Sequence, residues 1–104
     1  MIAPSTVPKT IPTAFRRPAY LFTLVERTAG GALYAQRTES GRLVAFEVHR
    51  IRCREERRIG GHVIEAGEYL ARSEEWGRHG WTYSGTGAFE RAKAKMTALG
   101  PQTA

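Results

Sequence analysis

A chain of 104 residues with 41% hydrophobic and 25% charged residues is long enough for one hydrophobic core and too short for two independent ones. This composition is close to the globular average, which excludes wholesale disorder. Sixteen basic residues against ten acidic ones give a net charge of +6, and thirteen of the sixteen are arginine. Arginine suits anionic partners, but a GC-rich genome also favours Arg, Ala and Gly codons, so the preference for arginine does not decide the function.

The chain contains a single cysteine, Cys53, which excludes an intramolecular disulfide and a cysteine-paired structural zinc site. A reducing compartment, and hence a cytoplasmic location, is expected. No stretch approaches the roughly 20 apolar residues of a membrane-spanning helix, and residues 1–18 lack the apolar core of a signal peptide. The sequence therefore predicts no membrane partner.

Four of the five prolines lie in residues 1–19, among small and hydroxylated side chains with little apolar surface. Proline fixes its own φ and keeps the preceding residue out of the helical region. Residues 1–19 are therefore predicted to form a flexible arm that carries Arg16 and Arg17 at its end. The predicted domain spans residues 20–100, and residues 101–104 form a C-terminal tail.

Three runs rich in aromatic and β-branched residues follow the arm: YLFTLVER (20–27), ALYAQRT (32–38) and RLVAFEVHRIRCR (42–54). The turn-forming segments TAGG (28–31) and ESGR (39–42) separate them. Three antiparallel strands joined as a meander are the simplest arrangement of these runs.

The apolar residues of the third run change parity. Up to Val48 they lie at even positions, whereas Ile51 and Cys53 lie at odd positions. Either a β-bulge near His49 and Arg50, or a strand whose far end leaves the first core, explains this change. The two explanations point the arginines of the run in different directions.

Residues 59–71 are predicted to form one more short strand and a loop, and residues 73–87 an irregular or partly extended packing segment. An amphipathic helix is predicted from about Gly87 to Leu99, ended by a Gly-Pro pair. Its apolar face consists of Phe89, Ala92, Met96 and Leu99. The predicted fold is α+β: an antiparallel β-meander of three to five strands with one C-terminal amphipathic helix packed on it.

Five arginines lie within HRIRCREERR, residues 49–58. In a strand, three of them would project from one face about 6 to 7 Å apart, close to the spacing of successive phosphates in a nucleic acid. The alternative is a solvated strand end whose arginines pair with Glu47, Glu55 and Glu56 at little gain in stability. The helix adds two basic residues four positions apart. The predicted anion-binding residues are Arg50, Arg52, Arg54, Arg57, Arg58, Arg91 and Lys95.

Trp76, Trp81 and Tyr83 are candidate aromatic contacts, since unpaired bases stack on such rings. In a domain of this size tryptophans more often form the core, and this interpretation is favoured. If their segment is extended, alternation places Trp81 and Tyr83 on a shared side.

His49 and Cys53 are four positions apart, a spacing that matches no recognised metal motif. Arginines near Cys53 would favour a thiolate, but no motif brings this cysteine to a general base. No catalytic residue, no cofactor and no metal are therefore predicted, and the protein is not expected to be an enzyme.

The segments AFEVHRIR, EEWGRHGWTY and AFERAKAKM resemble uncharacterised small accessory proteins of phages and mobile elements, over about residues 20–99. The tryptophan-containing segment is the most distinctive part of this pattern. The resemblance implies a partner in a host complex and supplies no catalytic residues. Anti-CRISPR inhibitors are one class of similar size. Many of them are acidic mimics of nucleic acid, which a basic chain does not match.

These observations predict a non-enzymatic basic module that docks on nucleic acid or on a nucleic-acid-containing complex. The alternative is a protein-binding inhibitor of a host defence complex, anti-CRISPR-like, that acts through an aromatic, shape-driven interface. A meander leaves an unpaired edge strand, so a homodimer formed through a sheet edge is a further expectation.

Overall fold

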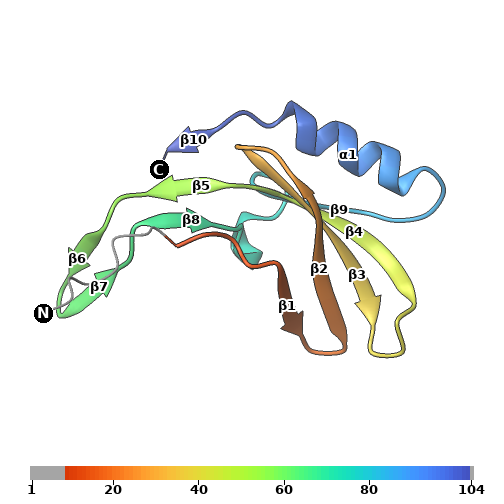
Figure 1. The fold of residues 1–104 in the computed structure, drawn as a ribbon, viewed down its shortest axis with the longest axis horizontal. Helices are drawn as coiled ribbons and strands as arrows, with labels where there is room; N and C mark the ends of the chain where they lie inside the picture. The colour runs from red at the N-terminus through yellow and green to blue at the C-terminus, as the bar shows by residue number, and fades with distance from the viewer. Residues whose placement is uncertain (1–8, 104) are drawn as a thin grey trace, which may run out of the picture.

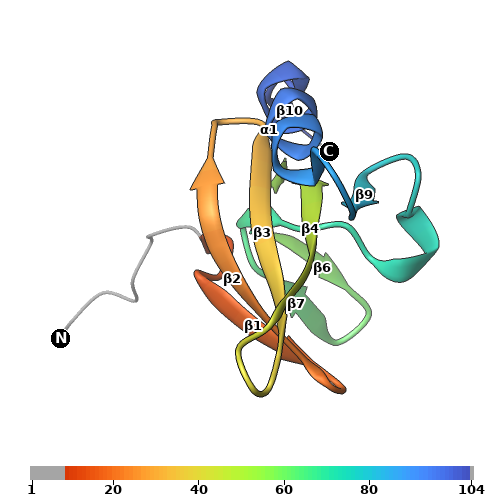
Figure 2. The same cartoon turned by 90° about the vertical axis from the view of Figure 1, so that its right-hand side faces the viewer.

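The computed structural model of the protein describes residues 9–103, and its centre is a five-stranded antiparallel sheet (Figures 1 and 2). The strand order is β1-β2-β3-β4-β9, so the first four strands are neighbours in chain order. The predicted antiparallel meander is confirmed. Its strands are β1 (Ala14–Arg17), β2 (Tyr20–Arg27), β3 (Gly31–Thr38), β4 (Leu43–Arg50) and β9 (Gly80–Tyr83).

The turn between β2 and β3 lies where the sequence predicts it and packs closely on the end of the chain. The Thr28 hydroxyl accepts hydrogen bonds from the backbone N–H groups of Gly30 and Gly31, at 3.2 and 2.9 Å. A Cβ atom on Gly31 would lie 2.6 Å from the carbonyl oxygen of Met96, and one on Gly30 would lie 2.3 Å from the backbone of Gly100. Glycine is therefore required here for close approach of the two backbones.

The boundary between arm and domain differs from the prediction, because residues 14–17 form the edge strand β1. The reason is apolar burial: Phe15 stacks on Phe22 at 4.8 Å between ring centroids, and Ile11 is buried. The Tyr34 hydroxyl donates a 2.6 Å hydrogen bond to the carbonyl of Pro12. The folded unit thus begins before residue 20, and the first eight residues of the predicted arm lie outside the described part of the chain.

Both faces of the sheet are buried, which explains the change of parity in the third run. One cluster lies under the helix: Leu33, Val48, Ala92, Met96 and Leu99. The other lies on the opposite face: Ile11, Phe22, Ala32, Tyr34 and Ile51. Odd positions of β4 face this second cluster, so Ile51 continues the side of His49, and the chain then leaves the sheet. The second of the two predicted explanations is the correct one.

The predicted helix is confirmed as α1 (Ala88–Ala98), with Gly87 and Leu99 as its N-cap and C-cap. It packs against β3, β4 and β9 (Figure 2). Phe89, at the end of the apolar face of the helix, is 37% exposed, and its ring centroid lies 5.5 Å from that of Phe46. Within residues 9–103, no helix has the length and apolar character needed to cross a membrane.

A second ribbon extends from the main sheet, where the sequence predicts only one short strand and a loop (Figure 1). Strands of three residues are too short for alternation to be visible in the sequence. The predicted C-terminal tail also contributes, since β10 pairs in parallel with β5. The ribbon contains β5 (Arg52–Arg54), β8 (Gly67–Tyr69), β10 (Gln102–Thr103), the hairpin β6 (Arg57–Ile59) and β7 (His62–Ile64), and the 3-10 helix η1 (Ser73–Glu75) follows it.

Candidate anion-binding surface

The arginine-rich run passes from one sheet to another at Ile51. This side chain is fully buried, and its backbone N–H donates to the carbonyl of Gly30 at 2.9 Å. Arg50 is therefore the last residue of β4, whereas Arg52 and Arg54 belong to β5. The predicted row of three arginines on one strand is divided between two sheets, and each arginine has a different environment.

Arg50 and Lys95 lie over the same tryptophan ring. The Arg50 guanidinium carbon is 6.0 Å from the ring centroid of Trp81, and the Lys95 ammonium nitrogen is 4.1 Å from the ring centroid. Strand pairing brings β9 beside β4, with Trp81 opposite Val48, and α1 lies across both strands. Three separate parts of the chain thus meet at one half-buried ring.

A second pair of a cation and an aromatic ring lies two residues further along β9, the edge strand. Arg91 lies over the ring of Tyr83 at 6.0 Å and donates a 2.8 Å hydrogen bond to the carbonyl of Ser84. Trp81 and Tyr83 share one side of β9, as alternation predicts, and both pack against the cluster under the helix. We call the surface formed by Arg50, Trp81, Tyr83, Arg91 and Lys95 the Trp81 seam.

Arg52 has a structural role that the run does not reveal. Its guanidinium donates to Oε1 of Glu75 at 2.5 Å, and its side chain is only 12% exposed. The backbone N–H of Arg72 also donates to this carboxylate, and together with Arg52 it holds the pKa of Glu75 below its usual range. Arg52 therefore has its charge compensated, unlike the residues of the seam.

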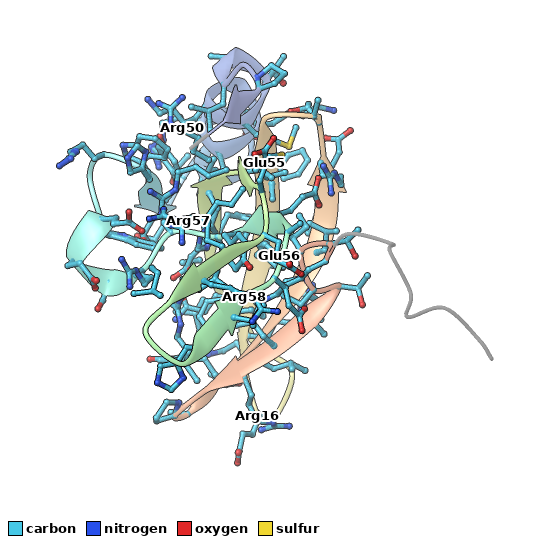
Figure 3. All side chains as sticks on the ribbon, turned by 90° about the vertical axis from the view of Figure 1, so that its left-hand side faces the viewer. Arg16, Arg50, Glu55, Glu56, Arg57 and Arg58 are labelled. Atoms are coloured by element: carbon cyan, nitrogen blue, oxygen red, sulfur yellow. The ribbon has the colours of Figure 1, made fainter. Side chains whose placement is uncertain are left out.

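The remaining arginines of the run lie in β5 and in the β6–β7 hairpin, where Figure 3 labels Arg57 and Arg58. Arg54 packs over the ring of Tyr69 at 4.9 Å, and Lys9 lies over the same ring at 4.7 Å. Arg57 and Arg58 are exposed on β6, and since they are consecutive they project from opposite faces of the hairpin. The hairpin lies at one end of the long axis of the molecule, away from β1, the strand that contains Arg16 (Figure 1).

In the part of the chain that the structure describes, no arginine of residues 49–58 forms an ion pair with Glu47, Glu55 or Glu56. Across residues 9–103, Arg52 is the one member of the seven predicted anion-binding residues that forms an ion pair. Glu47 instead contacts Arg17 and His49, inside the sheet. The six other predicted basic residues therefore keep their charge uncompensated by any described carboxylate.

Trp76 is separate from the other two aromatic candidates. Its ring meets His49 edge to face at 5.2 Å, and its Nε1–H donates to the Thr82 hydroxyl at 3.1 Å. A Cβ atom on Gly80 would lie 2.5 Å from this ring, so the tryptophan packs directly on the strand backbone. Trp76, Trp81 and Tyr83 consequently do not form one continuous stacking platform.

Two basic residues next to the seam are absent from the predicted set. Arg78 and His79 lie in the loop before β9, and the backbone N–H of Arg50 donates to the carbonyl of His79 at 2.8 Å. The segment EEWGRHGW contains both residues in sequence, but only the pairing of β9 with β4 places them beside Arg50.

His49 and Cys53 do not form a metal or catalytic centre together. Both ring nitrogens of His49 are hydrogen-bonded, to Glu47 and to the backbone N–H of Ala71. Cys53 lies in β5 and lines a separate cavity of about 550 Å³ with Arg54 and other residues of the ribbon. In the described part of the chain, no group of three or more His, Cys, Asp or Glu side chains is placed to hold a metal ion.

Comparison of the chain with protein-family models, curated proteins and solved structures finds no match to any of the three.

Proposed function

We propose that the protein is a non-enzymatic module that binds nucleic acid, or a complex containing nucleic acid, through the Trp81 seam. One observation carries the proposal: Arg50 and Lys95 lie over one tryptophan ring with no carboxylate partner among the described residues. Since each cation lies within 6.0 Å of the Trp81 ring centroid, the charges of Arg50 and Lys95 are at most about 10 Å apart. This separation is roughly the Debye length at 0.1 M salt. They repel each other in the free protein, and a phosphate bound between them removes that repulsion.

The spacing of the cations on α1 also supports a polyanionic partner. Arg91 and Lys95 are four residues apart on the helix, which corresponds to about 6 Å along its axis. Successive phosphates of a nucleic-acid strand have a similar separation. The rings of Trp81 and Tyr83 hold the cations in place by cation–π contacts worth about 0.5 to 1 kcal/mol each at exposed sites. This reduces the side-chain entropy that is lost on binding.

A salt series tests the proposal. Binding of fluorescent single- and double-stranded DNA and RNA oligonucleotides is measured from about 50 to 200 mM salt, for the wild type and for Arg50→Ala/Arg91→Ala/Lys95→Ala. Each phosphate contact makes the slope of log K against log salt more negative by about 0.7 to 0.9. The slope of the triple variant is therefore expected to be smaller in magnitude than that of the wild type by about 2 to 3. Arg52 is left unchanged because its ion pair with Glu75 supports the fold.

A matched control separates a local surface from net charge. Arg16→Ala/Arg37→Ala/Arg42→Ala removes the same number of charges at the opposite end of the sheet, near the β1–β2 and β3–β4 turns (Figure 3). This control should keep the wild-type slope. Equal slopes in both triple variants, or no binding by the wild type at low salt, would contradict the proposal.

The hairpin supports a second candidate function, that of a protein-binding inhibitor of a host complex. Ile59 and Val63 are 51% and 49% exposed on β6 and β7, and strand register places them on opposite faces of the hairpin. Apolar side chains on a projecting ribbon suit a protein partner, and their contacts are insensitive to salt. This candidate would be supported over the first by a protein partner whose affinity is the same at low and high salt. Ile59→Ser/Val63→Ser should then abolish binding of that partner, and the triple variant of the seam should not.

A further inference from the structure

The loop between η1 and β9 brings His79 next to two arginines of different sheets. The carbonyl of His79 accepts a 2.8 Å hydrogen bond from the backbone N–H of Arg50. The backbone N–H of His79 donates a 2.9 Å hydrogen bond to the carbonyl of Glu75. The carboxylate of Glu75 in turn accepts from Arg52 at 2.5 Å. Arg50, Arg52 and His79 are therefore joined through short contacts, beside the Trp81 seam.

Each of these three side chains has a buried nitrogen without a hydrogen-bond partner among the described residues. These atoms are Nε of Arg50, Nε of Arg52 and Nδ1 of His79. A buried polar group left unpaired destabilises the fold, so three such nitrogens on neighbouring residues are unusual in a folded protein. A ligand with several acceptor oxygens would offset these costs at one site.

The charges around His79 also favour an anion. Arg50 at the end of β4, Arg52 on β5 and Arg78 in the loop are cationic, and Glu75 on η1 is the carboxylate that faces them. Burial lowers the pKa of His79 below its usual 6.5, and the charges of Arg52, Arg50 and Arg78 lower it further, against the opposing effect of Glu75. These effects favour the neutral imidazole in the free protein.

We propose that Arg50, Arg52 and His79 form a phosphate-binding subsite at which His79 takes up a proton when the phosphate group binds. This inference rests on the proposed function, because the phosphate is that of a nucleic-acid strand lying along the Trp81 seam. The bound anion adds a negative charge next to the imidazole, which favours the imidazolium form, and the imidazolium N–H then donates to a phosphate oxygen. Affinity is consequently expected to rise as the pH falls toward 6.

Calorimetry measures the proton uptake directly. The wild type is titrated with a single-stranded oligonucleotide near pH 6.5 in two buffers of different ionisation enthalpy, which gives the number of protons bound per complex. His79→Gln is expected to bind more weakly and to lose up to one proton of uptake. His62→Gln, on the exposed β7 strand, is the matched control and should keep the wild-type uptake.

NMR titration of His79 with inorganic phosphate tests the subsite independently of nucleic acid. Phosphate should raise the pKa of His79, whereas chloride at equal ionic strength should not, and Arg50→Ala should weaken the effect. If oligonucleotides bind with a steep salt slope but the proton uptake of His79→Gln equals that of the wild type, the subsite is wrong and the proposed function stands. If no oligonucleotide binds, the proposed function is wrong, and the phosphate titration then tests the subsite alone: an unchanged His79 pKa overturns it, and a raised pKa supports a phosphate site that does not serve nucleic acid.

Discussion

Nε2 of His49 lies 3.0 Å from Oε1 of Glu47, inside a sheet face whose other buried residues are apolar. The backbone N–H of Ala71 donates to Nδ1 of His49 at 3.2 Å, so the ring proton is on Nε2 and points at the carboxylate. Arg17 donates to the second oxygen of Glu47 at 3.3 Å. These contacts link β4 to β1 and to the segment before η1, and they replace the hydrogen bonds that water would make to this buried pair.

Removing the carboxylate from this network should destabilise the fold. Glu47→Leu leaves both the His49 ring N–H and the Arg17 guanidinium without an acceptor, at an expected loss of about 3 kcal/mol in the free energy of unfolding. Glu47→Gln keeps one acceptor oxygen and should cost about 1 kcal/mol. Urea denaturation measures both. Glu39→Leu, which breaks the exposed pair with Arg16, is the control, and an equally small effect at Glu47 would contradict the assigned role.

The glycines of the β2–β3 turn should not tolerate a side chain. Gly31→Ala forces a methyl group against the backbone of Met96 at the end of α1, and such overpacking costs about 1 to 3 kcal/mol. Gly61→Ala, in the hairpin turn, meets no atom within 4 Å and should be neutral or slightly stabilising. Thermal unfolding of the two variants compares them, and equal melting temperatures would show that the turn and the helix end are not in close contact.

Stability in acid should depend on Glu68. Its carboxylate accepts two hydrogen bonds of 2.7 Å from Arg27 and one from the backbone N–H of Ile11, and these contacts lower its pKa below the usual 4.5. Since the folded-state pKa lies below the unfolded one, this stabilisation is present above about pH 4.5 and is lost as the pH falls through the folded-state value.

Urea denaturation between pH 2 and 6 tests the role of Glu68. Glu68→Gln should reduce the stability at pH 6 and flatten its dependence on pH below 4.5. Glu65→Gln is a nearby control, because the structure describes no ion pair for Glu65. An unchanged acid dependence in Glu68→Gln would show that the Arg27 contact is not maintained in solution.

The β6–β7 hairpin should open far more readily than the main sheet. It consists of two three-residue strands with mostly exposed side chains, whereas β3 is paired on both sides and buried over residues 31–35. An isolated two-stranded hairpin is marginally stable in water. Hydrogen exchange should therefore be much faster for the amides of 57–64 than for those of 31–35. Binding of a partner to Ile59 and Val63 would slow it, while binding at the Trp81 seam would not.

Features that depend on neighbouring residues could be predicted from the amino-acid sequence. The spacing of Phe89, Ala92, Met96 and Leu99 and the glycines on either side predict α1 to within one residue of each end. The turns at 28–31 and 39–42 predict the meander, because turn formation and alternation are local properties. The concentration of arginine in residues 49–58 is likewise visible in the sequence, as is the positive net charge.

Tertiary structure decided how those arginines are used. The chain leaves the main sheet at Ile51 because this side chain completes the second core, and local sequence carries no information about a core built from β1, β2 and β3. The same long-range packing pairs Arg52 with Glu75 and brings Lys95 to Trp81, across 23 positions in the first case. The candidate site depends on which strand lies beside which, and that is settled by the burial of both sheet faces rather than by any segment alone.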